Sequence, residues 1–352
     1  MTERYNPDDL IECTADLFAA AGLDAPIARV VAEILVEAEL LGYDTHGLQF
    51  IPAYIAGIEG GGTECHGEPS VLKDGGNTLL LDARGLPGQW ATVKALEWAL
   101  ERLPAHGTVT AVLRHCGNIS CLATYAKRAA DRGAMAIVAT SAPGNGVVAP
   151  PGGREGRVST NPMAVAIPTN GSPLLIDTST ASVSNRQVER ARRSEMRLPD
   201  AMLIDVDGRP SDDPETLLGE PKGAILPVGG MALGHKGFAF SILVEALTTS
   251  LAGVGRAGPE RAAGSNTFLM LIDPGAFGGG DAFRDEAGAL AAWCRSAAPV
   301  DPERPVRMPG DRAARHWAEQ MANGVRLHEE VPGLYTPVFE RYGIEPPKPI
   351  KH

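Results

Sequence analysis

The sequence predicts an α/β protein that begins with a helical segment. Two amphipathic patterns with helical spacing occupy most of residues 7–41, and apolar runs of strand length then alternate with helical patterns as far as residue 178. The 352 residues include 41 glycines and 28 prolines, which implies many tight turns. Because a single core seldom grows beyond about 250 to 300 residues, we expect one large interleaved body or two intergrown ones.

The N-terminal helical segment is expected to span residues 1–75. Its first helix begins where Asn6 can cap a turn that starts with a proline, and it ends at Gly22. A second helix is predicted from residue 24 to Gly42, and a third from 48 to 58. The connector between the second and third helices reads YDTHG, and its histidine has no obvious part in packing.

A central α/β region is expected over residues 76–255 and a C-terminal α/β region over residues 256–352. Strands are predicted at 77–82, 107–114, 134–140, 162–168, 173–178 and 267–273. Helices are predicted at 87–103, 119–132, 236–252, 281–297, 311–323 and 329–341. The loop 141–162 shows no periodicity. Loops of this length in compact domains are usually functional, so we expect it to face a ligand.

Charge and cysteine content argue against several classes of function. A formal net charge of −11 and a pI near 5.3 disfavour binding to a nucleic-acid backbone, which needs a basic face. The five cysteines include no C-x-x-C pair and indicate reduced thiols rather than a disulfide framework or a zinc ribbon. The N-terminus lacks the pattern of a signal peptide, and no apolar run is long enough to cross a bilayer. We therefore expect a soluble, cytoplasmic protein without nucleic-acid or membrane partners.

Three motifs look like ligand sites but lack the required context. Residues 253–258 match G-x-G-x-x-G, yet they follow a helical pattern instead of a strand, so a loop is favoured over a dinucleotide site. The acidic stretch from Asp205 lacks the glycine and the bidentate glutamate of a calcium loop and is expected to be a solvated turn. Cys116 and Cys121, beside His115, have the wrong spacing for a metal centre, so no metal is predicted.

Four segments combine small residues with polar groups that a ligand could contact. They read DTHG at 44–47, RHCGN at 114–118, PGGREG at 151–156 with STNP at 159–162, and GHKG at 234–237. Taken singly, each histidine is more often structural. Together and in this order, they resemble the malate/L-lactate dehydrogenase family that is unrelated to Rossmann-type enzymes. That family also includes sulfolactate, ureidoglycolate and diketogulonate dehydrogenases and cyclic ketimine reductases, and the resemblance covers nearly the whole chain.

The resemblance implies a non-Rossmann NAD(P)-binding fold with mixed sheets, a homodimer, and hydride transfer between nicotinamide and a 2-hydroxy or 2-oxo acid. NADH or NADPH would lie against nine residues, namely Thr160, Asn161, Asp177, Thr178, Ser179, His235, Lys236, Gly310 and Asp311. An imidazole that titrates near neutrality suits the general acid for the carbonyl oxygen. His46 is the first candidate, with Thr45 supporting it through a hydroxyl, and His115 matches a second active-site histidine.

The chain departs from the family pattern where the substrate would bind. The family has an arginine four residues after the first histidine, where it grips a substrate carboxylate, and this position is Phe50 here. Two charge-assisted hydrogen bonds, worth about 1.5–3 kcal/mol each, are thereby lost. Asn185-Arg186 stands where the family usually has Arg-Gly, and Asn118 is a further candidate at the substrate.

Two explanations of Phe50 remain open. Arg186, Arg114 or Arg154 could supply the cation from another direction, or a larger or less acidic substrate could lie on the ring. Reduction of a cyclic imine and cofactor binding without turnover also stay open as functions. Retention of both histidines and of Lys236 favours an enzyme, whereas a metal-dependent hydrolase lacks a cluster of ligands.

Overall fold

A large mixed sheet forms the centre of the computed structural model, which describes residues 3–257 and 264–350. In spatial order its seven strands within these residues are β1 (Ser70–Asp74), β2 (Thr78–Asp82), β3 (Thr108–Cys116), β10 (Ser265–Ile272), β4 (Met135–Ser141), β5 (Met163–Ile167) and β6 (Leu174–Thr178). Strands β2 and β3 are parallel, and the other neighbours are antiparallel. The expected α/β class with mixed sheets is confirmed.

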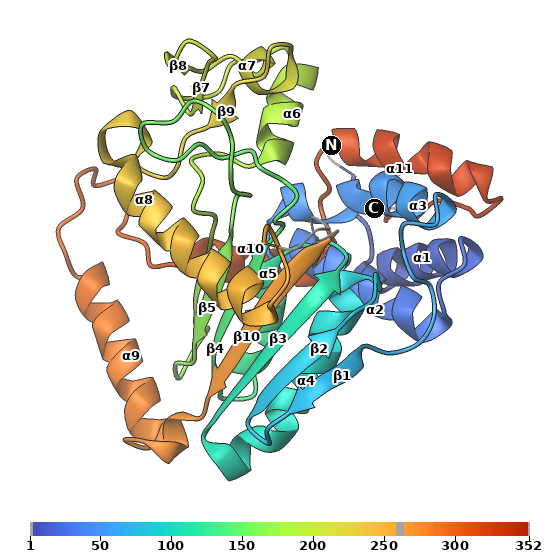
Figure 1. Ribbon diagram of the computed structural model, residues 1–352. Helices are drawn as coiled ribbons and strands as arrows, with labels where there is room; N and C mark the ends of the chain where they lie inside the picture. The colour runs from blue at the N-terminus through green and yellow to red at the C-terminus, as the bar shows by residue number, and fades with distance from the viewer. Residues whose placement is uncertain (1–2, 258–263, 351–352) are drawn as a thin grey trace.

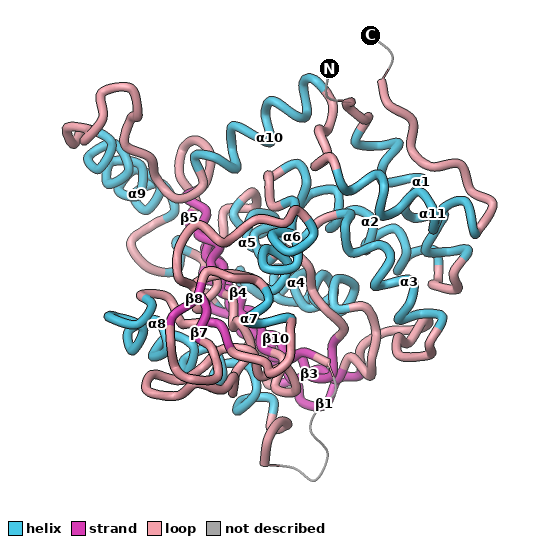
Figure 2. Tube along the Cα trace, turned by 90° about the horizontal axis from the view of Figure 1, so that it is seen from above, coloured by secondary structure: helices cyan, strands magenta, loops and turns pink. Residues whose placement is uncertain are grey.

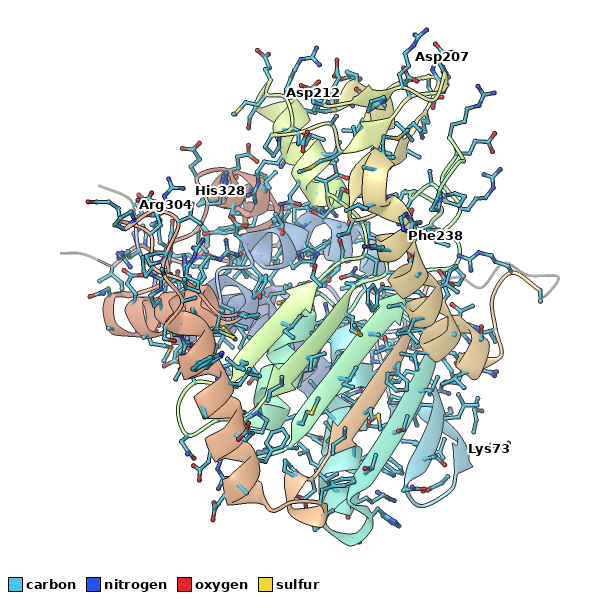
Figure 3. All side chains as sticks on the ribbon, turned by 90° about the vertical axis from the view of Figure 1, so that its left-hand side faces the viewer. Lys73, Asp207, Asp212, Phe238, Arg304 and His328 are labelled. Carbon is cyan, nitrogen blue, oxygen red and sulfur yellow. The ribbon has the colours of Figure 1, made fainter. Side chains whose placement is uncertain are left out.

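Helices cover both faces of this sheet. Helices α4 (Gly88–His106) and α5 (Leu122–Ala130) pack on one face, mainly against β3, β4 and β5. Helix α8 (Gly230–Glu245) and the π-helix η3 (Ala246–Ser250) cross the opposite face, and α9 (Gly280–Arg295) lies on the same side (Figure 3). A short 3-10 turn, η4 (Pro274–Ala276), joins β10 to α9.

The N-terminal helices form a second layer beside α4 and α5 (Figure 1). They are α1 (Pro7–Ala20), α2 (Ala25–Leu40), the 3-10 turns η1 (Asp44–His46) and η2 (Leu48–Phe50), and α3 (Ile51–Glu59). Leu10, Leu17 and Phe18 of α1 are fully buried, and burial of each such side chain contributes about 1.5–3 kcal/mol. Helices α10 (Asp311–Asn323) and α11 (Glu330–Arg341) complete this layer from the C-terminal part of the chain.

A small sheet stands over one end of the large one. It consists of β8 (Pro210–Ser211), β7 (Leu203–Ile204) and β9 (Ala224–Ile225), accompanied by α6 (Asn185–Arg193) and α7 (Glu215–Leu218). Figure 2, viewed from above, shows α6 near the centre of the molecule, between this sheet and the N-terminal helices. Helix α6 therefore brings a charged stretch of the chain close to the connector after α2.

Most elements lie where the sequence predicts them, and the exceptions are short or polar. Helix α8 begins at Gly230, six residues before the predicted start. Its apolar side chains lie all around the helix, so the sequence shows no amphipathic pattern that would mark where the helix begins. Strand β1, α6 and the small sheet were not predicted. The three segments 1–75, 76–255 and 256–352 remain a proposal, and β10 from the third lies between β3 and β4 of the second.

The motifs that lacked context behave as loops and turns. Residues 253–257 follow η3 and not a strand, and the rest of the G-x-G-x-x-G match lies outside the described residues. The Asp205 carboxylate accepts the backbone N–H groups of Asp207 and Arg209, as expected for a solvated acidic turn. Residues 3–257 and 264–350 contain no cluster of ligands suited to a metal ion. Within the same residues, every helix is too short or too polar to cross a membrane.

Candidate active site

The turn between α2 and α3 presents His46. Gly42 has φ +77°, a conformation that glycine adopts without strain, and it lets the chain leave α2 sharply. The Thr45 hydroxyl lies 2.9 Å from His46 Nδ1, and the Ser120 hydroxyl donates to the His46 carbonyl. The imidazole is thus fixed at one nitrogen by its neighbour and at its backbone by a residue that precedes α5. No described residue bonds Nε2, so this nitrogen is available to a ligand.

A buried carboxyl group underlies the same turn. Glu39 of α2 accepts a hydrogen bond of 2.8 Å from the Leu48 N–H. A Cβ added at Gly47 would lie only 2.1 Å from the Glu39 Oε1, so glycine is required for the chain to pass over this carboxyl. Burial raises the pKa of Glu39 to about 8, against the smaller lowering by the Leu48 N–H. At neutral pH this carboxyl is therefore mostly protonated.

Phe50 begins a stack of aromatic rings beside His46. The centroids of the His46 and Phe50 rings are 6.1 Å apart, and Tyr54 stacks on Phe50 at 5.2 Å with an interplanar angle of 10°. The Tyr54 hydroxyl donates to Asn118 Oδ1 at 2.7 Å and accepts from Gln89 Nε2 at 2.8 Å. The stack is thus apolar at Phe50 and becomes polar at its far end.

Helix α6 closes the site from the opposite side. Its N-terminus is held by a capping box between Ser184 and Gln187. The Arg186 guanidinium lies 4.7 Å from the Phe50 centroid, within the range of a cation–π contact, and forms an ion pair of 2.7 Å with Glu189. Arg190, one turn further on, pairs with Asp44 at 3.2 Å and so ties α6 to the His46 turn.

The surroundings of His46 favour its neutral form. Burial and, to a smaller extent, the charge of Arg186 lower the pKa of His46 to about 4, and Asp44 acts in the opposite sense. At pH 7, three units above this pKa, the imidazole is therefore almost entirely neutral. The contact with Thr45 allows either neutral tautomer, because the hydroxyl can donate to Nδ1 or accept from Nδ1–H. An anion placed between His46 and Arg186 would offset the cation and raise this pKa.

A second group of polar residues lies at the end of β6. The Asp177 carboxylate caps α5 by accepting the Ala123 N–H at 2.8 Å, and burial raises its pKa to about 6. Thr178 is exposed and Ser179 half-buried. The Thr180 carbonyl accepts the N–H of Val228 at 2.9 Å, which places the start of α8 beside this strand end. Exposed His235 of α8 lines a cavity of about 530 Å³, together with the loop at 150–155.

Comparison with known proteins identifies the family and the fold. A model of the family described as malate/L-lactate dehydrogenase matches residues 5–333. The chain belongs to this family. The L-lactate dehydrogenase of Cupriavidus necator is 31% identical over 311 residues, which cover 86% of this chain and 88% of that protein.

Two further relatives span almost the whole chain. The L-sulfolactate dehydrogenase of Methanothermobacter thermautotrophicus is 28% identical over 337 residues, covering 93% of this chain and 94% of its own. The structure of Δ1-piperideine-2-carboxylate reductase from Pseudomonas syringae pathovar tomato superposes with a TM-score of 0.84 at 26% identity, over 96% of this chain and all of that one. The family membership makes this protein an oxidoreductase.

The two histidines that the family resemblance singled out have different surroundings in the structure. His46 lies in the aromatic and cationic setting just described. His115 has φ +53° at the end of β3, and its Nδ1 lies 3.1 Å from a carboxylate oxygen of Asp82, which also pairs with Arg114 at 2.8 Å. Arg114 is therefore engaged by Asp82. From the same segment, Asn118 and Ser120 contact the residues around His46.

The predicted cofactor residues of this malate/L-lactate dehydrogenase family member fall into exposed and buried groups. Thr178, His235 and Lys236 are exposed, and Gly310 and Asp311 lie beside β6, where the Pro309 carbonyl accepts the Leu175 N–H at 3.2 Å. Asn161 is fully buried, and its amide bonds Ser241 and Glu245 under α8. Its neighbour Thr160 accepts the N–H of Thr180. Asn161 thus supports the strand end from below and leaves the ligand-facing part to other residues.

Several residues of the site were not found from the sequence. Glu39, Tyr54, Ser120 and Arg190 all contact the His46 turn or its stack. One signal was present, because Glu39 is a charged residue within the apolar pattern of α2 and such residues are almost always paired or functional when buried. Arg190 lies in the charged stretch 189–195, a pattern that most often marks a solvated face, yet it pairs with Asp44.

Proposed function

We propose that this protein transfers hydride between a nicotinamide cofactor and a 2-hydroxy or 2-oxo acid or a related carbonyl compound. The observation that carries the proposal is the placement of His46 between a supporting hydroxyl and an aromatic platform topped by a cation. A proton donor next to an anion-binding group is what reduction of a carbonyl beside a carboxylate requires. The names of the relatives, dehydrogenases of lactate and sulfolactate, agree with such substrates.

In this proposal His46 exchanges a proton with the substrate oxygen through Nε2. When Nδ1–H donates to the Thr45 hydroxyl oxygen, Nε2 is unprotonated in the neutral ring and carries the exchangeable proton in the imidazolium. When the substrate anion binds near Arg186, the two charges offset each other and the pKa of His46 rises, which makes the imidazole a better match for general acid catalysis. In the oxidation of a hydroxy acid, neutral His46 accepts the proton of the substrate hydroxyl at Nε2.

Arg186 is our candidate for the missing carboxylate-binding cation. Phe50 occupies the position of the usual arginine, and the Arg186 guanidinium lies over the Phe50 ring at 4.7 Å. The guanidinium keeps donors beyond the one used on Glu189, because it has five N–H groups. In this proposal the cation that binds the carboxylate comes from α6, and the turn η2, which ends at Phe50, supplies an apolar surface.

The residues at the end of β6 fit a nicotinamide dinucleotide. When bound, that cofactor would supply or accept the hydride. Thr178, Ser179, His235 and Lys236 offer hydroxyl, imidazole and ammonium groups suited to phosphate and ribose. A Cβ at Gly310 would lie 2.7 Å from the Leu175 nitrogen, so only glycine lets this segment lie close to the strand. These residues would bind and orient the dinucleotide with one end toward His46.

The first experiment is a titration of the full-length protein with NADH and NADPH, followed by nicotinamide fluorescence. We expect saturation below ~1 mM, the upper end of ordinary KM values. Absence of binding for both dinucleotides far above that concentration would falsify the proposed function. A protein that binds but converts none of a panel of 2-oxo acids, 2-hydroxy acids and cyclic imines would instead be a cofactor-binding homologue without turnover.

Reduction of a cyclic imine is the second candidate. The similarity to Δ1-piperideine-2-carboxylate reductase favours it. The same panel separates the two candidates. A kcat/KM for cyclic imino acids at least tenfold above that for open-chain 2-oxo acids would establish imine reduction as the main activity.

We also propose a homodimer, formed through the face that carries α8 and α9. Helix α8 exposes Met231, Leu233, Phe240, Ile242 and Leu243, and α9 exposes Leu290 and Trp293. Large apolar side chains exposed together on a helix often mark an interface, and the family resemblance makes a second copy the proposed occupant. Sedimentation should give a dimer that Phe240→Glu dissociates. Met196→Glu, at an exposed methionine outside α8 and α9, is the matched control and should leave the dimer intact.

A cytoplasmic location is proposed as well. All five cysteines are free thiols, which is typical of a reducing compartment. Recovery of the native protein from an extracytoplasmic fraction of its host would contradict this location.

A further inference from the structure

A cavity lined by three arginines lies beside the predicted cofactor segment. Its volume is about 580 Å³, and its walls come from the turn between β5 and β6, from α9 and from the start of α10. Arg295, Arg307 and Arg315 line it together with Gly310 and Asp311. A cluster of guanidinium groups around a cavity is unexpected in a chain with a net charge of −11. It indicates an anionic ligand.

The acid that lines this cavity, Asp311, is already engaged. Arg295 donates to Asp311 at 2.6 and 3.3 Å, and the Met308 N–H donates to the same carboxylate at 2.8 Å. The hydrogen bond from Arg295 lowers the pKa of Asp311, so the pair stays ionised and neutralises itself. In Rossmann-type enzymes, an acid beside the adenosine ribose binds the 2′-hydroxyl of NADH and disfavours a phosphate there. Here its oxygens are occupied and its charge is balanced.

Two cations in the cavity remain uncompensated. Arg315 donates only to the backbone carbonyl of Asp311, at 3.3 Å. Neither Arg307 nor Arg315 forms an ion pair with any residue in the described ranges 3–257 and 264–350. Two guanidinium groups with free donors can grip a phosphate monoester, whose charge at neutral pH is close to −2.

The cavity continues the line of the proposed cofactor site. The Pro309 carbonyl bonds Leu175, two residues before Asp177 on β6. Arg312, next to Asp311, lies near Tyr43. Burial raises the pKa of Tyr43, and the charge of Arg312 opposes this effect. Tyr43 itself bonds the turn of His46, because its carbonyl accepts the His46 N–H. A dinucleotide whose nicotinamide lies at His46 would therefore point its adenosine end at the three arginines.

We propose that Arg307 and Arg315 bind the 2′-phosphate of NADPH, and that the enzyme prefers NADPH to NADH for this reason. The inference rests on the proposed function, since it assigns one end of the cofactor of that site. The diphosphate common to both dinucleotides is left to Thr178, Ser179, His235 and Lys236. The two arginines then discriminate between the dinucleotides, because only NADPH carries the additional phosphate.

The test measures binding to the full-length protein and needs no turnover. Dissociation constants for NADPH and NADH are obtained by fluorescence, and those for 2′,5′-ADP and 5′-AMP by calorimetry. We expect NADPH to bind at least 10-fold more tightly than NADH, as 1.4 kcal/mol from charge-assisted bonds would give, and 2′,5′-ADP to bind more tightly than 5′-AMP. The double variant Arg307→Gln/Arg315→Gln should weaken NADPH to the level of NADH and leave NADH within about twofold.

A matched control and the opposite outcomes complete the design. Arg304→Gln removes an arginine of the same loop, labelled in Figure 3, that pairs with Asp301 and does not line the cavity, so both constants should stay unchanged. Equal affinity for the two dinucleotides, or an equal loss of both in the double variant, overturns this inference while the proposed function stands. Failure of both dinucleotides to bind overturns the proposed function and the inference with it. All variants change exposed side chains, and unchanged melting temperatures confirm that they are folded.

Discussion

The His46 turn and helix α6 meet at the candidate substrate site, yet they are specified in opposite ways. The turn is held mainly by contacts that span at most nine positions: Glu39 to Leu48, Thr45 to His46, and Gln49 to the Asp44 carbonyl. Ser120 adds a more distant hydrogen bond to the His46 carbonyl. Helix α6 is held by partners far away in the sequence, since Arg190 reaches Asp44 across 146 positions and Arg193 reaches Glu330 across 137. A locally built turn can keep its shape while the wall that faces it changes.

This difference suits the His46 turn to proton transfer and helix α6 to substrate selectivity. His46 would exchange the proton that any substrate of the family needs. In the proposed function, Arg186 and Phe50 would decide which substrate lies next to it. Substitutions in the turn should therefore lower turnover for every substrate, whereas substitutions in α6 should change the preference among substrates.

The largest effect is expected for His46→Gln. Glutamine can still accept the Thr45 hydroxyl but has no group that titrates, so we expect kcat to fall by ~10²–10⁴-fold, the usual contribution of general acid–base catalysis. The dissociation constant of the cofactor should change by less than about threefold. Steady-state kinetics and fluorescence titration measure the two quantities.

His115→Gln is the matched control for this prediction. His115 pairs with Asp82 at the end of β3, and we expect less than a tenfold loss of kcat. If His115→Gln lost more activity than His46→Gln, proton transfer would have to be assigned to His115 and the comparison above would break.

The extent to which each region was predictable follows from the same contrast. The sequence places α1, α2, α3 and the DTHG turn correctly, because amphipathic spacing and the glycine at the end of α2 are local signals. It did not reveal α6, whose residues 185–193 read as a polar charge run with one buried side chain, Val188. The position of Arg186 over Phe50 depends on how the small sheet packs, and no spacing rule encodes that.

The next largest effect is expected for Arg186→Met, which removes the cation and keeps an unbranched side chain over Phe50. Loss of charge-assisted hydrogen bonds to a carboxylate costs about 1.5–3 kcal/mol, so KM for anionic substrates should rise by ~10–100-fold. The pKa of His46 should also rise toward its ordinary value, because the positive charge that lowers it is gone. In the oxidation direction, where neutral His46 accepts the proton, the acidic limb of kcat/KM would then shift to higher pH.

Arg192→Met provides the control, since Arg192 lies on the same helix and pairs with Glu215 away from the site. It should change neither KM nor the acidic limb. A sharper version exchanges the two positions: Phe50→Arg combined with Arg186→Gly should act on pyruvate or oxaloacetate better than either single variant. If Phe50→Arg alone raised activity on pyruvate or oxaloacetate as much as the double variant does, the two arginines would not compete for the same substrate carboxylate.

The smallest effect is expected beneath the turn, from Glu39→Gln. Glutamine keeps an oxygen for the Leu48 N–H and cannot ionise. In the folded protein burial raises the pKa of Glu39 to about 8, above its ordinary value of 4.5, so the folded state binds this proton more tightly than the unfolded chain does. The stability that the protonated group contributes is fully present below about pH 4.5 and is lost as the pH rises through 8. Protein carrying Glu39 should therefore lose stability over this window.

Glu39→Gln should not lose stability in this way. We therefore expect the variant and the parent protein to have similar melting temperatures at pH 5 and the variant to have the higher one at pH 9. Allowing for relaxation around the charged carboxylate, the difference should be on the order of 1–2 kcal/mol, or a few degrees in Tm. Glu33→Gln on the same helix is the control: it breaks the ion pair of 2.9 Å with Arg29 and should change the stability by less than about 1 kcal/mol at either pH. Parallel melting profiles for Glu39→Gln and the parent protein would mean that Glu39 is ionised beneath the turn. The negative charge nearest to Leu48 would then stabilise a protonated His46, and the local construction of the turn, rather than Arg186 alone, would tune the proton donor.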